Sequence, residues 1–236
     1  MFNPKPVIQL IELPGHHPCV VIDDFLLEPE SLAAAAVQHR AGFAAAPTNA
    51  FPGIEMRMSA EVDARLNDFF MLHVRRLLGA RRVTEMYSRL SMVTLAPEQL
   101  SPLQRLCHHD NGDDIPGISF PASVLYLFKD AALGGTSLYR PKQGRQEMAR
   151  LMEQWAQLPS GEFSEVIGTA PGYLNASNEY FELICTVPAR WNRIVFYDGG
   201  IFHSAHITQP ELLSDDPARG RLTLNGFWVC RQAAGG

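Results

Sequence analysis

Most of the sequence after residue 84 is divided into short apolar runs, and this division constrains the fold more than any other feature. The runs are rich in Val, Ile, Thr, Tyr and Phe, and clusters of Gly, Pro and Asn separate them. Such runs are typical of β-strands and such clusters of turns. The predicted strands cover residues 86–95, 120–128, 135–140, 180–188, 193–198, 202–208 and 221–230. Seven strands at close spacing predict a sandwich or barrel.

The first 83 residues have a different pattern, which predicts one short strand and two helices. The strand is Cys19–Ile22. A helix begins at Glu28-Pro29-Glu30, because the helix dipole favours acidic residues in the first turn. Residues 58–82 carry apolar side chains at three- and four-residue spacing, with Ser59 as N-cap and Gly79 as the stop. A further helix at 146–158 interrupts the strands. We therefore predict a single, mainly β domain with an N-terminal helical layer (α+β).

Composition excludes several classes of protein. With 236 residues and 46% hydrophobic residues the chain can bury a sizeable core, and its net charge of −5 argues against a general nucleic-acid-binding surface. No apolar run approaches the roughly 20 residues that span a bilayer. The start of the sequence lacks the pattern of a secretory signal. The four cysteines form no CxxC pair, so we expect reduced thiols and a cytoplasmic protein.

The segment "RLCHHDNGDD" at residues 105–114 is a candidate metal site. If it ends a strand, His108 and Asp110 point to one face and His109 points away. A third ligand would come from "FHSAH", which offers His203 and His206. Two histidines and one carboxylate on one face, with the other positions open, are typical of non-haem Fe(II) oxygenases. The alternative is a solvated turn, because the segment is rich in turn-forming residues.

The predicted strand "RLTLNGFWVC" carries a second chemical signal. Arg221 and Thr223 share one face of it, together with Asn225 and Phe227. An arginine inside a barrel is costly unless it meets a carboxylate, and its planar fork suits a dicarboxylate, to which Thr223 adds a hydroxyl donor. A metal that chelates one end of a keto acid while Arg221 holds the other end fits both segments. The alternative is an edge-strand arginine paired with Asp215 or Asp216.

The order of these motifs resembles the prolyl-hydroxylase-like branch of the Fe(II)- and 2-oxoglutarate-dependent dioxygenases. The run "HHDNGDDIPGISFPASVLYLFKDAALGGTSLYR" is similar to the family's HxD motif, a strand ending in a YLN-like sequence, and a GG-T-F turn and strand. "NRIVFYDGGIFHSAHI" and "GRLTLNGFWV" are similar to its distal-histidine strand and its R-x-S/T strand. The resemblance covers roughly residues 85–231. It implies a double-stranded β-helix, also described as a jelly-roll or cupin-like barrel.

The resemblance also implies roles for individual residues. His108, Asp110 and His203 would ligate Fe(II), so that His203 rather than His206 is the third ligand, and His206 would be exposed. Arg221 and Thr223 would hold the distal carboxylate of 2-oxoglutarate, and Tyr126 would hydrogen-bond the same group. Halogenating relatives lack the carboxylate ligand, so Asp110 favours hydroxylation. O₂ would be the oxidant.

The sequence departs from this family at three places. Phe128 stands where the family often has Asn, and the connection between His203 and Arg221 is several residues longer than usual. A long insertion at about 142–180 interrupts the core, which we place at 84–231 after an N-terminal part at 1–83. We expect this insertion to cover or shape the cleft. Loops tolerate such insertions at small entropic cost.

These features predict a hydroxylase that decarboxylates 2-oxoglutarate to succinate. The alternative is a non-catalytic module that binds a metal or a small acid on the same barrel. A zinc hydrolase is a third possibility, but it lacks an evident general base and gives the Arg221 strand no role. Amino-acid derivatives, peptides and protein side chains all stay open as substrates. We expect neither general nucleic-acid binding nor membrane association, and no pattern indicates an oligomeric state.

Overall fold

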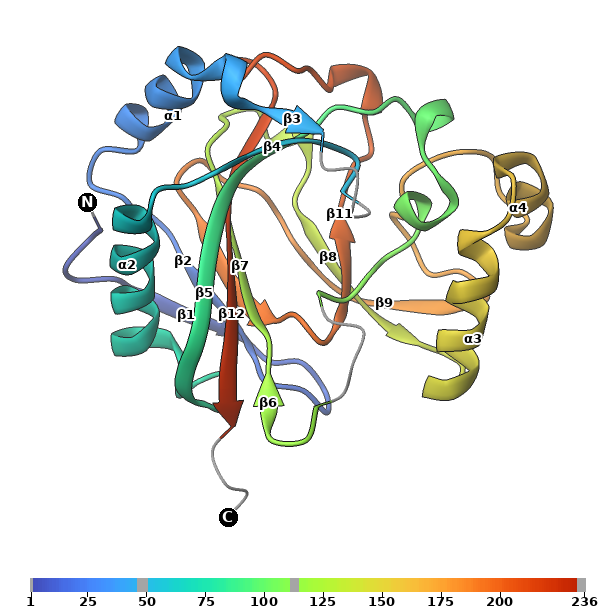
Figure 1. The fold of residues 1–236 in the computed structure, drawn as a ribbon, viewed down its shortest axis with the longest axis horizontal. Helices are drawn as coiled ribbons and strands as arrows, with labels where there is room; N and C mark the ends of the chain where they lie inside the picture. The colour runs from blue at the N-terminus through green and yellow to red at the C-terminus, as the bar shows by residue number, and fades with distance from the viewer. Residues whose placement is uncertain (1, 46–50, 111–114, 233–236) are drawn as a thin grey trace.

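The computed structural model describes residues 2–45, 51–110 and 115–232, and its strands form two antiparallel sheets (Figure 1). The larger sheet has the order β1-β2-β10-β7-β12-β5-β4-β3, with β6 paired to β12, and the smaller has the order β11-β8-β9. The strands of the larger sheet are β1 (Ile8–Ile11), β2 (Cys19–Ile22), β3 (Ala44–Ala45), β4 (Gly53–Arg57), β5 (Ala80–Val93), β6 (Ile118–Ser119), β7 (Pro121–Tyr126), β10 (Ile194–Asp198) and β12 (Arg221–Gln232). Those of the smaller sheet are β8 (Thr136–Pro141), β9 (Phe181–Val187) and β11 (Phe202–Ala205).

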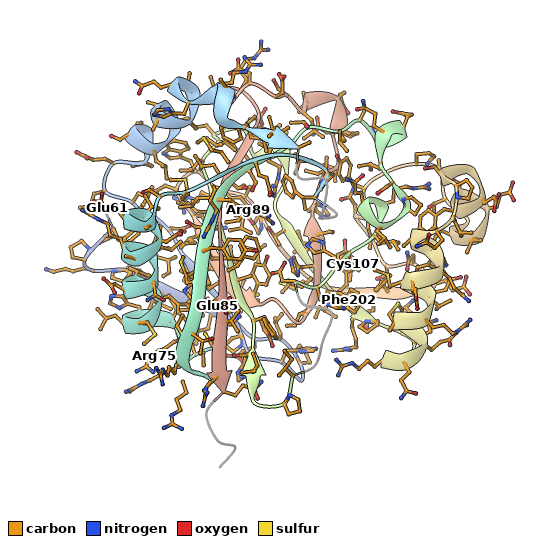
Figure 2. The ribbon with its side chains drawn as sticks, in the orientation of Figure 1. Glu61, Arg75, Glu85, Arg89, Cys107 and Phe202 are labelled. Atoms are coloured by element: carbon orange, nitrogen blue, oxygen red, sulfur yellow. The ribbon has the colours of Figure 1, made fainter. Side chains whose placement is uncertain are left out.

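The N-terminal helices cover the outer face of the larger sheet. Helix α1 (Pro29–Gln38) and helix α2 (Ala60–Phe69), which continues as a π-helical turn at Phe70–Val74, both pack on the main core, and α2 runs alongside β5 (Figure 1). Ser59 caps α2, since its Oγ accepts a hydrogen bond from the backbone N–H of Val62 at 3.5 Å. The apolar side chains that α2 turns toward the sheet form the main core with Leu90, Leu222, Leu224 and Trp228. In Figure 2, Glu61 points from the opposite side of α2 to solvent.

The smaller sheet carries a second helical layer, built from the insertion between β8 and β9. Helix α3 (Arg145–Ala156) and helix α4 (Ser160–Ile167) contribute Trp155 and Phe163 to a cluster that also contains Tyr139 and Phe202 of the smaller sheet. Arg105 fixes α4 to the segment before His108, because its guanidinium donates to the Ser160 carbonyl and to the Ser164 hydroxyl. The segment that carries the histidine pair is thereby anchored on a packed layer.

The prediction of a mainly β chain with N-terminal helices and a double-stranded β-helix is confirmed. From β7 onward the chain passes from the larger sheet to β8 and β9 in the smaller one, back to β10, across to β11, and back to β12. This alternation between two facing sheets is the jelly-roll arrangement. Within the described residues, however, the two sheets do not close into a barrel, because β1 and β3 are the free edges of the larger one.

Several element boundaries differ from the sequence prediction. The helix predicted from Ser59 to a stop at Gly79 ends as an α-helix at Phe69 and continues as a π-helical turn at Phe70–Val74, and β5 begins at Ala80, directly after the predicted stop. Strands β1 and β4 and helix α4 were not predicted, because each is short and gains its stability from pairing or packing with distant segments. The strand predicted at 202–208 ends at Ala205. Part of the "RLCHHDNGDD" segment, residues 111–114, lies outside the described residues.

Candidate metal centre

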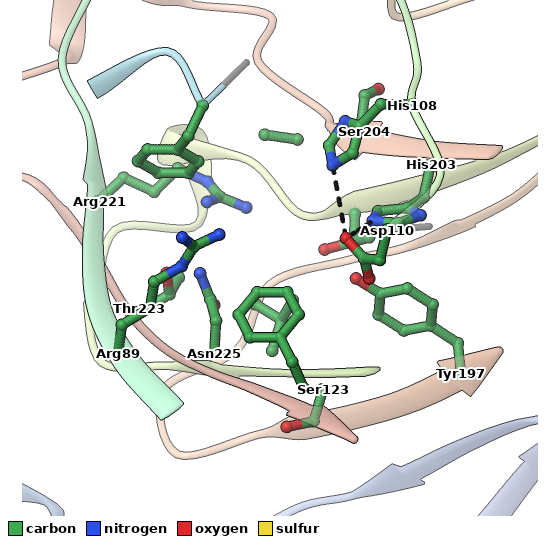
Figure 3. Close-up of a pocket in the computed structure, with 15 residues that line it drawn as sticks. Arg89, His108, Asp110, Ser123, Tyr197, His203, Ser204, Arg221, Thr223 and Asn225 are labelled. Atoms are coloured by element: carbon green, nitrogen blue, oxygen red, sulfur yellow. Dashed lines mark ion pairs between the residues drawn. The ribbon is translucent and has the colours of Figure 1, made fainter. Parts of the chain in front are cut away.

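The two histidines of the predicted site meet across a β-bridge at the edge of the smaller sheet. His108 pairs with His203 through two backbone hydrogen bonds, of 2.9 Å from the His108 N–H and 2.7 Å from the His203 N–H. Their ring centroids are 4.5 Å apart. Because residues facing each other in a bridge project their side chains to the same side, the pairing brings both imidazoles to the same cavity (Figure 3).

Asp110 completes the cluster from the loop that follows His108. Its backbone N–H donates to the Gly199 carbonyl at 2.8 Å, which fixes the loop against the turn between β10 and β11. Its Oδ1 lies 3.5 Å from Nε2 of His203 and 3.8 Å from Nε2 of His108. One ligand atom of each of the three residues lies within 4.8 Å of the others. The three side chains therefore converge on one point.

Gly199 is required for this convergence. A Cβ atom at position 199 would lie 2.7 Å from Oδ2 of Asp110 and 2.5 Å from the carbonyl oxygen of Phe120. Either distance is too short for a carbon atom, so a side chain at position 199 would displace the Asp110 carboxylate or the Phe120 backbone. The first glycine of "YDGG" thus serves the close approach of Asp110.

The donor set fits a divalent transition metal. Two imidazoles and one carboxylate on one face form the facial triad that suits Fe(II). Nδ1 of His203 is 2.8 Å from the Ile201 carbonyl, and since a carbonyl only accepts, Nδ1 carries the proton and Nε2 is left to bind a metal. Oδ2 of Asp110 is buried and has no hydrogen-bond partner in the described part of the chain. A buried carboxylate oxygen in this state is stabilised by a cation.

The charges in the cluster also suit a metal. Burial lowers the pKa of His108 to about 4, helped by repulsion from His203, so the His108 imidazole is neutral at pH 7. Burial opposes ionisation of Asp110 and His203, but their mutual attraction outweighs it: the pKa of Asp110 is lowered and that of His203 is raised. The carboxylate is therefore ionised, and His108 offers a lone pair.

The other two histidines of the candidate segments, His109 and His206, lie outside the cluster. The His109 ring packs against the ring of Phe202, at 4.8 Å between centroids, on the side away from the metal ligands. His206 lies past the end of β11, where its Nδ1 and the Ser137 hydroxyl are 2.9 Å apart. The expectation that His206 is exposed is wrong, because this contact holds the ring half-buried.

Arg221 lies at the opposite end of the same cavity (Figure 3). It is 4% exposed, and its Nη2 and Nε donate to the carbonyls of Gly135 and Gly134 at 2.7 and 3.3 Å. The rings of Tyr126 and Phe128 lie 5.9 and 5.7 Å from its guanidinium carbon. Burial lowers the pKa of Arg221. No carboxylate pairs with this cation among the residues that the structure describes.

The alternative in which Arg221 pairs with an upstream aspartate finds no support in the structure. Asp215 pairs with Arg40, at 2.9 Å between Nη2 and Oδ1, and both groups are largely exposed. Oδ1 of Asp216 accepts a hydrogen bond from the backbone N–H of Ala218. Arg221 is instead held by the GG turn, where Gly134 has φ +83°. A buried guanidinium that donates only to carbonyls retains its charge for an anion.

Thr223 and Tyr126 lie beside Arg221 but differ in their access to the cavity. Thr223 lines it, and its hydroxyl donates to the Ser91 carbonyl at 3.3 Å. Tyr126 faces Thr223 in the β7–β12 ladder but does not line the cavity, and its hydroxyl is 2.8 Å from that of Thr136, which does. Of this pair, Thr136 is the residue in position to contact a ligand directly.

The structure adds polar and aromatic residues that the sequence did not single out as site residues. The cavity of about 70 Å³ is also lined by Arg89 of β5, Ser123, Asn225 and Tyr197 (Figure 3). The Tyr197 ring packs against His203, at 4.8 Å between centroids. Alternation along β12 already placed Asn225 on the Arg221 face, whereas Arg89 reaches the cavity through strand pairing that no local pattern predicts.

A protein-family model matches residues 4–228, almost the whole chain, and describes a family of unknown function, DUF6445. The chain belongs to the DUF6445 family. No curated protein matches it. Within the described residues of this DUF6445 protein, no helix has both the length and the apolar character to cross a membrane.

Solved structures that match the DUF6445 chain include a prolyl-4-hydroxylase, an α-ketoglutarate-dependent carbocyclase and a protein solved with 2-oxoglutarate. A prolyl-4-hydroxylase from Pseudomonas putida is 13% identical, with coverage of 94% of this chain and 95% of that chain and a TM-score of 0.48. The non-haem α-ketoglutarate-dependent carbocyclase SnoK from nogalamycin biosynthesis is 17% identical, with coverage of 90% and 79% and a TM-score of 0.49. HygX from Streptomyces hygroscopicus, solved with nickel, 2-oxoglutarate and hygromycin B, is 14% identical, with coverage of 90% and 82% and a TM-score of 0.45.

Proposed function

We propose that this protein is an Fe(II)- and 2-oxoglutarate-dependent oxygenase that hydroxylates an unidentified substrate. One observation carries the proposal: a convergent His-Asp-His cluster and a buried arginine without a carboxylate partner in the described residues line one cavity. A metal would balance the Asp110 carboxylate at the cluster, and an anion would balance the Arg221 guanidinium at the other end of the cavity. A keto dicarboxylate meets both requirements in one molecule.

His108, Asp110 and His203 would hold the metal on one face and leave its remaining positions open. When bound, Fe(II) and 2-oxoglutarate supply O₂ activation coupled to decarboxylation of the co-substrate to succinate. The Ile201 carbonyl orients the His203 ring, and the Gly199 carbonyl holds the Asp110 loop. The protein's contribution is therefore a preorganised set of ligands that face one cavity.

Arg221 and Thr223 would bind the distal carboxylate and so fix the orientation of the co-substrate. The Gly134 and Gly135 carbonyls hold the guanidinium in place before a ligand arrives, which reduces the entropy lost on binding. Tyr126 would support this end through the hydroxyl of Thr136 rather than by direct contact. The Arg221 and Tyr126 contacts exist without the ligand, whereas the Thr223 hydroxyl would turn from the Ser91 carbonyl to donate to the carboxylate.

The test has two stages. Calorimetry under anaerobic conditions measures 2-oxoglutarate binding with and without Fe(II), and we expect binding that depends on the metal. An aerobic assay then measures succinate released without added substrate. Binding without oxygen-dependent consumption of 2-oxoglutarate would support the non-catalytic module instead, and correctly folded protein that shows neither result would refute the proposal.

A further inference from the structure

Arg89 lies where the metal cavity meets an outer cavity, and it has no role in the proposed oxygenase reaction. It stands on β5 directly opposite Asn225 of β12. It lines both the metal cavity and an outer, open cavity of about 300 Å³. The other residues that line the outer cavity are Glu55, Arg57 and Tyr87. A molecule in the outer cavity would therefore contact Arg89 and border the metal site.

The polar groups of Arg89 and Asn225 are only partly satisfied. Nη1 of Arg89 pairs with the Glu55 carboxylate at 2.8 Å, and both side chains are 17% exposed. Nε of Arg89 and Oδ1 of Asn225 are buried without a hydrogen-bond partner in the described ranges. A guanidinium has five N–H donors in a rigid fork, so one bond to Glu55 leaves donors for a second carboxylate. An unpaired buried donor is costly, so a carboxylate that accepts from Nε of Arg89 gains affinity, whereas Oδ1 of Asn225 only accepts and would take a hydrogen bond from a donor group of the ligand.

An apolar surface lies beside these polar groups. The Phe227 ring, which lines the metal cavity, is 4.6 Å from the guanidinium carbon of Arg89. The Tyr87 ring stacks on Phe227 with centroids 4.9 Å apart and is 40% exposed. The guanidinium carbon of Arg57 lies 4.6 Å from the centroid of the Tyr87 ring. A hydrogen bond to the Ser88 carbonyl and an ion pair with Asp63 hold the guanidinium there. The place where the two cavities meet thus combines a cationic group with two packed rings.

We propose that Arg89 binds a carboxylate of the substrate while Tyr87 and Phe227 pack against its apolar body. The substrate class is a small carboxylic acid with an apolar body that extends toward the metal. Naming this ligand a substrate rests on the proposed oxygenase function, whereas the carboxylate site itself does not. Glu55 competes for the same guanidinium, so its carboxylate weakens the binding of a substrate acid.

Benzoate and benzamide are suitable probes, because they share a shape and differ in charge. The protein is loaded with Zn(II), which does not activate O₂, and with 2-oxoglutarate, which occupies Arg221. Calorimetry then measures benzoate binding. We expect the wild-type protein to bind benzoate and not benzamide. In Arg89→Gln the affinity for benzoate should fall at least about tenfold. We expect Glu55→Gln to strengthen it by about threefold, since a competing carboxylate is removed. Arg140→Gln, at an exposed pair with Glu182, is the matched control.

Arg89→Gln and Glu55→Gln are expected to change benzoate affinity in opposite directions, and this difference separates a role in binding from a role in folding. If Arg89→Gln lowers the melting temperature, the Glu55→Gln result decides, because a merely structural ion pair would not tighten benzoate binding when broken. Equal binding of benzoate and benzamide, or no benzoate binding by the wild-type protein, would overturn the proposal. If the wild-type protein does not bind 2-oxoglutarate, the proposed oxygenase function is overturned instead. The benzoate titration with Zn(II) alone would then still test the carboxylate site.

Discussion

On strand β12, Leu222, Leu224 and Trp228 face the N-terminal helices, whereas Arg221 and Thr223 face the cavity, with Asn225 beside them. Each of these six residues is at most 8% exposed. The outer face is apolar and closely packed, while the inner face carries a cation, a hydroxyl and an amide. Equal burial with opposite chemistry indicates different roles, because buried polar groups cost stability unless something pairs with them.

The outer face stabilises the fold, and the inner face is arranged for a ligand. Leu224 pairs with Leu90 and Leu125 across two ladders, and its removal would leave a cavity. Arg221 donates to two carbonyls and is the charged group of the inner face. Substitutions on the outer face should therefore change stability, and those on the inner face should change binding. Leu224, Arg221 and Thr223 test this division, and Asp110 tests the metal end of the cavity that the inner face lines.

Asp110→Ala should remove detectable Fe(II)-dependent succinate formation, because the cluster loses its charged ligand. Metal affinity, measured in competition with a coloured chelator, should fall as well. His109→Ala is the control, since its ring packs on Phe202 and does not reach the cluster. Equal loss in both variants would mean that the ligand assignment is wrong.

Leu224→Ala should lower the free energy of unfolding by roughly 2–5 kcal/mol, the usual cost of a large-to-small change in a core. Urea denaturation measures this loss. The folded protein should still bind 2-oxoglutarate with wild-type affinity. Leu72→Ala, at a side chain that is 77% exposed, should leave stability nearly unchanged. A weaker 2-oxoglutarate affinity in folded Leu224→Ala protein would contradict the claim that the outer face of β12 affects only stability.

Arg221→Gln should weaken 2-oxoglutarate binding by about ten- to a hundredfold, which corresponds to the loss of a charge-assisted hydrogen bond. Its stability should stay close to that of the wild-type protein, because the substitution removes a buried charge. Arg221→Lys keeps the charge without the planar fork and should recover only part of the affinity. Anaerobic calorimetry gives both values, and unchanged binding in Arg221→Gln would contradict the role of this end of the cavity.

Thr223→Val should have the smallest effect, a loss of 2-oxoglutarate affinity of a few-fold, about 0.5–1.5 kcal/mol, because one neutral hydroxyl is removed at nearly constant shape. The same calorimetric titration measures it. A loss as large as that of Arg221→Gln would mean that the hydroxyl also positions the guanidinium.

Much of the fold and the candidate ligands followed from local patterns. Short runs rich in β-branched and aromatic residues predicted the strands, and the alternation of side chains along a strand separated His108 and Asp110 from His109. Short elements such as β4 and α4 escaped prediction because pairing and packing with distant segments stabilise them. His206 was expected to be exposed, yet Ser137, a residue of another strand, holds its ring half-buried.

The sequence by itself determined which side chains share a face of each strand, because that property depends only on a two-residue period. This period alone places Arg221, Thr223 and Asn225 on one face of β12. Only the tertiary structure decided what meets that face. The β-bridge sets His108 against His203, the GG turn receives the Arg221 guanidinium, and β5 brings Arg89 beside Asn225. These contacts depend on strand register and sheet stacking, which join residues far apart in the chain and leave no local periodic signal.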